Sequence, residues 1–295
     1  MIACIIHMET SNLSIIIPTL NEADFIGYLL FSLSRQTHKN FEVIISDGNS
    51  SDETVAVAKS FSGQLPKLTI VVSKKRSPGI QRNRGEEKAK YERLLFLDAD
   101  TILPPDFLEK TIFEIREKKL SVAHPIAFPM TRKIVDHYYY IWRNWGLDLL
   151  QNIYPQAQGL AIYSTKKVHK ALKGFDEKIT KLGEDSDYVT RAYKKGFKFG
   201  IVKSSNVYIS VRRAEGQRKI SLGFIKEAIM PQIYILLFGK VEAQKLIKRE
   251  YGNHSNLYKV LREKKDKSGF LKKLNKTEFE KFTENLSKLL KEITS

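Results

Sequence analysis

The chain has 295 residues, of which 42% are hydrophobic; this is enough apolar surface to bury a core, and it excludes wholesale disorder. The formal net charge of +17 favours an anionic partner, which composition leaves open among phosphorylated substrates, nucleic acid and an acidic membrane surface. The single cysteine, Cys4, excludes a disulfide framework and fits a reducing compartment, so we expect a cytoplasmic location.

Signals for strands and helices alternate over the first 130 residues. Strands are predicted at residues 13–17, 41–45, 68–72 and 93–97, of which the first and the last are expected to be buried, and helices at 25–33, 51–61, 77–83 and 104–115. This alternation is typical of an α/β fold, in which helices flank a mostly parallel central sheet.

Beyond Ser121 the alternation changes. Strands are predicted at 121–128, 158–163 and 198–202, and a helix at 183–195. The aromatic block at 137–145 has helical spacing, which fits core packing, while its Tyr and Trp side chains also suit a sugar face or a membrane interface. The sequence leaves these interpretations open.

The C-terminal part becomes rich in Lys and Glu from about residue 240, with Leu and Phe at helical intervals, which predicts basic amphipathic helices. The apolar run 220–238 contains Lys226, Glu227 and Pro231, so we expect no membrane-spanning helix. Its second half fits a core helix or a segment that dips into a bilayer surface, and we favour the surface. The N-terminal residues 1–12 are too weakly apolar to predict a signal peptide.

Two carboxylates, Asp98 and Asp100, close the apolar run 93–97. Carboxylates one residue apart repel each other unless a cation or strong donors satisfy them. One interpretation is a magnesium or manganese ion that holds a diphosphate at the carboxyl end of the sheet. The other is an ordinary strand-end turn, in which Asp is common.

Polar segments also follow the first two predicted strands, at residues 18–22 and 47–52. Helix capping would explain either segment alone, because Asn and Asp are frequent N-cap residues. Three strands that end in acidic or amide residues at one sheet edge are better explained by a shared ligand, and Asp47 is placed to accept a hydrogen bond from a nucleotide.

Five segments in order resemble the successive signatures of family 2 glycosyltransferases. They are residues 14–22, 43–52, 79–85 with 97–100, 174–177 (Gly-Phe-Asp-Glu) and 183–187. The resemblance covers about residues 13–213 and implies a GT-A fold with a domain at 1–218, divided into a nucleotide-binding half at 12–103 and an acceptor half at 121–213. The remaining 219–295 would be a helical basic extension that associates with a membrane.

The resemblance also implies roles for single residues. Contacts to the nucleotide sugar would come from Pro18, Thr19, Asn21, Glu22, Asp47, Arg82 and Asp98. Among these, Asp47 would face the base, Arg82 the diphosphate and Asp98 the ribose. Many relatives have two successive acids where this chain has Asp47 and Gly48, so the base contact would depend on Asp47 alone.

Asp100 would coordinate Mn²⁺ or Mg²⁺, and Asp185 would be the catalytic base, with Glu184 beside it in the acceptor region. A carboxylate at a helix start is kept ionised by the helix dipole, which lowers its basicity, and nearby acids such as Glu184 and Asp187 would restore some of it. Without the resemblance, these acids read as ordinary first-turn residues of a helix.

Paired arginines, Arg212 and Arg213, end a further predicted strand that begins at Val207. Arginine pairs suit bidentate phosphate contacts, and similar pairs follow the last core strand in membrane-acting relatives. We expect them to clamp the donor phosphates; a basic surface for anionic lipid is the alternative.

The resemblance implies an inverting, metal-dependent glycosyltransferase that moves a sugar from a UDP- or GDP-sugar to an acceptor hydroxyl or lipid phosphate, at the cytoplasmic face of a membrane. One alternative is a non-catalytic basic protein that binds lipid or nucleic acid, although the basic residues form no readable nucleic-acid motif. Another is a nucleotidyltransferase, which would leave the Glu184–Asp185 segment without a purpose.

Overall fold

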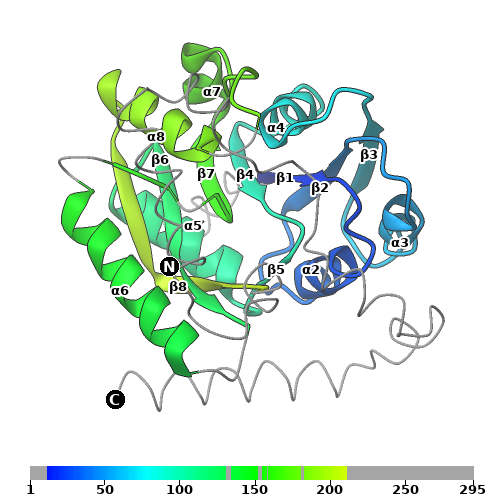
Figure 1. The fold of residues 1–295 in the computed structure, drawn as a ribbon, viewed down its shortest axis with the longest axis horizontal. Coiled ribbons are helices and arrows are strands. Elements are labelled where there is room, and N and C mark those ends of the chain that lie inside the picture. Colours follow the sequence, from blue (N-terminus) through cyan, green and yellow to red (C-terminus); the bar gives the residue numbers. More distant parts are fainter. Residues whose placement is uncertain (1–11, 131–133, 152–154, 158, 181–182, 211–295) are drawn as a thin grey trace, which may run out of the picture.

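The computed structural model describes residues 12–130, 134–151, 155–157, 159–180 and 183–210. The described strands form one eight-stranded sheet in the order β3-β2-β1-β4-β7-β6-β8-β5 (Figure 1). Their bounds are β1 Leu13–Thr19, β2 Phe41–Asp47, β3 Leu68–Val72, β4 Arg93–Leu97, β5 Thr101–Ile102, β6 Val122–Pro129, β7 Ala161–Thr165 and β8 Phe199–Ile209.

The sheet is mostly parallel, as predicted. β3, β2, β1 and β4 are parallel neighbours, and β8 is parallel to β6. β7 runs antiparallel to both β4 and β6, and β5 runs antiparallel to β8. The carboxyl ends of β1, β2 and β4 therefore meet at one edge, which is where open α/β sheets bind ligands.

Helices cover both faces of this sheet. The described helices are α2 Ile26–Ser34, α3 Thr54–Lys59, α4 Pro78–Glu86, α5 Phe107–Glu117, α6 Ile134–Leu150, α7 Lys166–Leu172 and α8 Glu184–Lys194. Because side chains alternate along a strand, Ile15 and Ile17 of β1 pack with residues of α2, α3 and α5. Ile16 packs into the opposite layer with residues of α7 and α8.

The predicted strand at 198–202 and the strand expected from Val207 are one strand, β8. It continues through a register shift against β6, where Lys203 and Ser204 are exposed. The Glu114 carboxylate accepts hydrogen bonds from the backbone nitrogens of both residues, at 2.9 and 2.7 Å. This side chain satisfies the backbone groups that the irregularity releases, so the strand does not end there.

No helix among the described residues is long and apolar enough to cross a membrane. Several predicted features lie outside those residues, namely Arg212, Arg213, the apolar run 220–238 and the extension 219–295.

Candidate active site

The ends of three strands bring together the first predicted site residues. Thr19, the last residue of β1, pairs in register with Asp47 at the end of β2, and Pro18 pairs with Ser46. Asp98 directly follows β4, which lies on the other side of β1. The residues expected at one sheet edge are therefore neighbours.

The Asp47 carboxylate is fully buried and joins two strand ends. It accepts hydrogen bonds from the Thr19 hydroxyl at 2.7 Å, and from the backbone nitrogen and hydroxyl of Ser50 at 2.7 and 2.6 Å. The Gly48 nitrogen also donates to the Thr19 carbonyl at 2.8 Å. Asp47 thus shapes the edge through protein contacts, and its contact with a nucleotide base stays a prediction.

The loops after β1 and β2 are held together by side chains. The Asn21 nitrogen donates to the Ser50 hydroxyl at 2.9 Å, and the Asn21 side-chain oxygen accepts from the Ser51 nitrogen at 2.9 Å. The Glu22 nitrogen donates to the Thr54 hydroxyl at 2.8 Å. Asn21 has a φ of 57°, a left-handed conformation that Asn tolerates better than most residues. Both loops are thereby fixed beside the sheet edge.

Arg82 of α4 connects the end of β4 with the start of α8. Its side chain is 1% exposed, and it donates to Glu184 at 2.8 Å, to Asp98 at 2.8 Å and to the Gly159 carbonyl at 3.1 Å. The guanidinium also lies over the Phe175 ring, 5.3 Å from its centroid. Both terminal nitrogens are engaged with protein acceptors, so the diphosphate contact implied by the resemblance stays a prediction.

Asp185 lies in the first turn of α8, next to Glu184. One carboxylate oxygen accepts from the Gly159 nitrogen, and the other accepts from the Ser186 nitrogen at 2.8 Å. Burial, and then the negative charge of Glu184, raise the pKa of Asp185 to about 6. Asp187 instead makes an ion pair with Arg191 at 2.6 Å.

A carboxylate with a pKa near 6 is ionised at neutral pH yet basic enough to accept a proton, which suits a general base. The interpretation of these acids as first-turn helix residues is also correct for their position, but it does not account for the buried pair of Glu184 with Arg82.

Gly159 is a site residue that the sequence did not reveal. Its carbonyl accepts from Arg82 while its nitrogen donates to Asp185. A Cβ atom at this position would lie 2.9 Å from the nearer Asp185 oxygen, so only glycine lets the two approach this closely. The available signal was a glycine inside the strand predicted at 158–163; in the structure this strand, β7, begins only at Ala161.

Asp100 is 6% exposed and follows Asp98 by two residues. Burial raises the pKa of Tyr140 to about 12, and the charge of Asp100 is a smaller effect in the same direction. Within the described ranges no group of three or more His, Cys, Asp and Glu residues could hold a metal ion. A single carboxylate ligand still fits Mg²⁺ or Mn²⁺, because Mg²⁺ is commonly bound by one or two carboxylates together with substrate phosphates.

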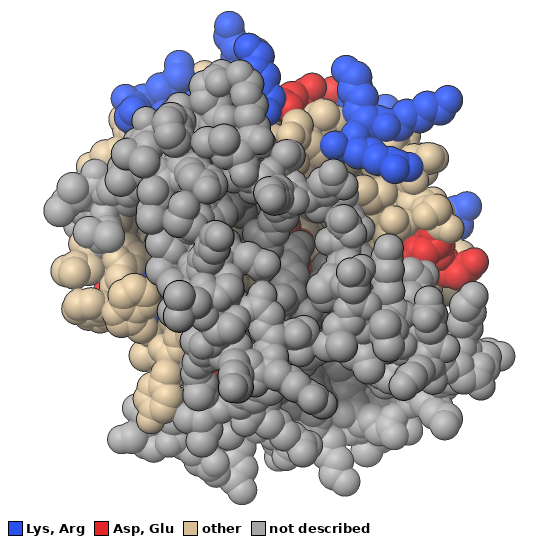
Figure 2. Space-filling model, in the orientation of Figure 1, with Lys and Arg blue, Asp and Glu red and all other residues tan. Residues whose placement is uncertain are grey.

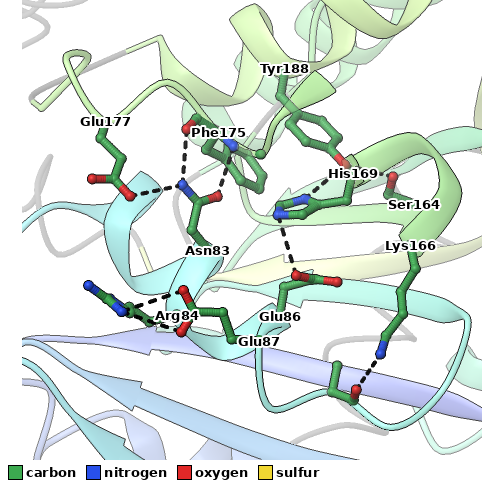
Figure 3. A network of polar contacts seen from close by, with 12 residues as sticks. Asn83, Arg84, Glu86, Glu87, Ser164, Lys166, His169, Phe175, Glu177 and Tyr188 are labelled. Atoms are coloured by element: carbon green, nitrogen blue, oxygen red, sulfur yellow. Dashed lines mark hydrogen bonds and ion pairs between the residues drawn. The ribbon is translucent and has the colours of Figure 1, made fainter. Parts of the chain in front are cut away.

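A second network of polar contacts surrounds Phe175, whose ring lies under the Arg82 guanidinium (Figure 3). The Asn83 side chain pairs with the backbone of Phe175, donating to its carbonyl at 3.0 Å and accepting from its nitrogen at 2.8 Å. The Phe175 ring stacks on Tyr188, whose hydroxyl contacts Ser164 at 2.9 Å and His169 at 3.2 Å. Through these hydrogen bonds and ring contacts, the Phe175 ring under Arg82 is connected to α4, β7, α7 and α8.

Comparisons with known proteins agree with this geometry. The family model described as "Glycosyl transferase family 2" matches residues 14–166. A "PGL/p-HBAD biosynthesis glycosyltransferase" from Mycobacterium bovis is 39% identical over 98 residues, which is 32% of this chain and 38% of that protein. The alignments span about a third of the length of the curated relatives.

Two solved structures show the same fold at low identity. S. aureus TarS in complex with UDP has a TM-score of 0.56 and 20% identity, and the match covers 76% of this chain and 64% of TarS. The mannosyltransferase PcManGT from Pyrobaculum calidifontis, in complex with GDP-Man and Mn²⁺, has a TM-score of 0.60 and 17% identity, over 81% and 65% of the two chains. Both are consistent with the expected GT-A fold.

Proposed function

The chain belongs to glycosyl transferase family 2, and from this premise we propose that it moves a sugar from a nucleoside diphosphate sugar to an acceptor, with inversion at the anomeric carbon. The observation that carries the proposal is the continuous set of contacts from Asp98 through Arg82 and Gly159 to Asp185. It links the strand edge that would hold the donor to the carboxylate that would activate the acceptor.

In this mechanism Asp185 takes the proton of the acceptor hydroxyl as that oxygen bonds to the anomeric carbon. The bond from the anomeric carbon to the diphosphate oxygen breaks on the opposite side, and the diphosphate leaves with the electron pair. Where the acceptor is a lipid phosphate, its oxygen is already anionic and needs no base. The raised pKa of Asp185 supports its role with a hydroxyl acceptor.

Arg82 and Gly159 hold Asp185 and its neighbour Glu184 in place. Asp100 would hold Mn²⁺ or Mg²⁺, which would neutralise charge on the leaving diphosphate. Arg212 and Arg213 would place two further positive charges beside the leaving diphosphate and so stabilise it.

For the donor we propose a UDP- or GDP-sugar, because TarS was solved with UDP and PcManGT with GDP-Man. For the acceptor we propose a glycan or a lipid-linked hydroxyl or phosphate at the cytoplasmic face of a membrane. The net charge of +17 supports an anionic surface of this kind.

A panel of nucleotide sugars, incubated with Mn²⁺ or Mg²⁺, tests the proposal by measuring release of nucleoside diphosphate. Release with one donor, and a product whose anomeric configuration by NMR is opposite to that of the donor, is expected. Release of sugar 1-phosphate in place of nucleoside diphosphate would indicate a nucleotidyltransferase instead. Binding of nucleotides without any release would indicate a non-catalytic protein.

A further inference from the structure

Helix α6 carries a row of exposed apolar side chains, which we name the α6 stripe. Its members are Tyr138, Trp142, Trp145 and Leu149, which are 63%, 67%, 61% and 60% exposed. They follow one another at intervals of four, three and four residues, so they lie along one face of the helix. In Figure 2 neutral side chains, drawn in tan, cover the region at the lower left where Figure 1 places α6.

Two polar side chains of α6 reach the sheet instead. Asn144 bonds to both backbone groups of Ala127, and Asp148 makes an ion pair with Lys203 at 2.7 Å. His137 is fully buried. A surface helix normally buries its apolar side, so α6 is oriented with its apolar side outward.

A continuous row of four large apolar side chains, each at least 60% exposed, is typical of a surface that contacts another molecule or a membrane. Trp and Tyr are the residues that favour the interface between lipid and water, because each has an apolar body and a polar tip. The polar tips of the stripe are one hydroxyl and two indole N–H groups, and it offers sugar hydroxyls no carboxylate or amide partner. The composition of the stripe therefore favours a bilayer surface over a carbohydrate.

The charge of the chain indicates which kind of bilayer. Residues 211–295 contain 20 Lys and Arg against 10 Asp and Glu. This segment begins where β8 ends, and there the Met130 nitrogen, just before α6, donates to the Ile209 carbonyl at 2.8 Å. The last described residues before the basic segment therefore lie beside Met130, and anionic lipid headgroups complement the charge of that segment.

We infer that the α6 stripe is the surface on which this protein lies against an anionic phospholipid bilayer. The inference rests on the proposed function, in which the acceptor lies at a membrane, and it adds that α6 is the element that contacts the membrane.

Tryptophan fluorescence tests this directly, because Trp142 and Trp145 are the two tryptophans of the chain. Adding vesicles of phosphatidylglycerol and phosphatidylcholine to the full chain should shift its emission to shorter wavelength, and brominated lipid should quench it. Vesicles of phosphatidylcholine alone should produce a much smaller effect. An unchanged emission spectrum with anionic vesicles would overturn the inference.

Flotation of a double variant, Trp142→Ala with Trp145→Ala, provides the second test. Both side chains are exposed, so the fold should persist, while the vesicle partition coefficient should fall by about tenfold or more. Phe113→Ala is the matched control, because Phe113 is 66% exposed on α5, outside the stripe, and its loss should leave partition unchanged.

Several outcomes would overturn the inference. The first is that the double variant floats with vesicles as well as the parent protein does. The second is that the emission shifts with protein concentration in the absence of lipid, which would indicate contact with a second copy of the chain. The third is that it shifts with soluble oligosaccharide, which would indicate a sugar site. Nucleoside diphosphate release is measured in parallel on the same protein preparations, without vesicles. This measurement separates the membrane proposal from the proposed glycosyl transfer. Vesicle binding without any release would refute the proposed function and leave the membrane surface standing; release with no vesicle binding would do the reverse.

Discussion

Replacing Arg82 with methionine should destabilise the protein far more than replacing a neighbouring arginine. Arg82 is 1% exposed and bonds Glu184, whose side chain is 10% exposed, and Asp98, whose side chain is 29% exposed. Removing one partner of a buried ion pair costs about 3–5 kcal/mol, because the other charge stays buried without compensation. Most of this loss should come from Glu184, since water can solvate the more exposed Asp98.

Urea unfolding at pH 7 measures the loss, and Arg84→Met is its matched control. Arg84 lies on the same helix, but it is 43% exposed and its contact with Glu87 is 3.4 Å long. Exposed pairs of this kind contribute about 0–1 kcal/mol. The double variant Arg82→Met with Glu184→Gln should regain part of the lost stability, because the unpaired charge is gone. A loss below about 1 kcal/mol for Arg82→Met, or equal losses for the two arginines, would refute the reasoning.

Three further predictions concern Asp185 and its surroundings. Because its pKa is raised to about 6, folding favours its protonated form, so its favourable contribution is complete below about pH 4 and is lost as the pH rises through 6. Asp185→Asn should therefore be more stable than the parent at pH 8 by about 3 kcal/mol, the free energy that corresponds to a pKa raised from 3.8 to about 6, and equally stable near pH 4, as measured by urea unfolding; equal stability at both pH values would contradict this. Gly159→Ala should lower the rate of nucleoside diphosphate release by about tenfold or more, because the added Cβ meets Asp185 at 2.9 Å, and an unchanged rate would remove Gly159 from the site. Removing divalent metal with EDTA should abolish release and added Mn²⁺ should restore it; full activity in EDTA would exclude a metal at Asp100.

Strand positions were predictable from runs of apolar and β-branched residues, including the partly exposed strand β3. The structure confirms the predicted bounds of β3 and β4, and it extends β1 and β2 by two residues each. β5 was missed because two residues carry no periodicity. α7 was missed because its seven residues include three lysines and offer little apolar pattern; the hydroxyl of Thr165, which caps its first turn at 3.2 Å from Val168, was the available signal.

The candidate site was predictable only in part. Acidic residues at strand ends show in the sequence, because strand ends follow from apolar runs, and the structure brings Thr19, Asp47 and Asp98 to one edge. The ion pair of Arg82 with Glu184 joins residues 102 positions apart. No local pattern reports such a contact, since it depends on how α4 and α8 pack across the sheet.

The central claim is that Asp185 is the base of a glycosyl transfer reaction, and the rate of nucleoside diphosphate release by Asp185→Asn tests it most directly. Asp187→Asn is the matched control, because Asp187 lies in the same helical turn but pairs with Arg191. With the donor identified from the panel, a hydroxyl acceptor and saturating Mn²⁺, we predict that Asp185→Asn loses at least about a hundredfold in kcat while Asp187→Asn keeps most of it. Equal rates for Asp185→Asn and the parent protein would contradict the account.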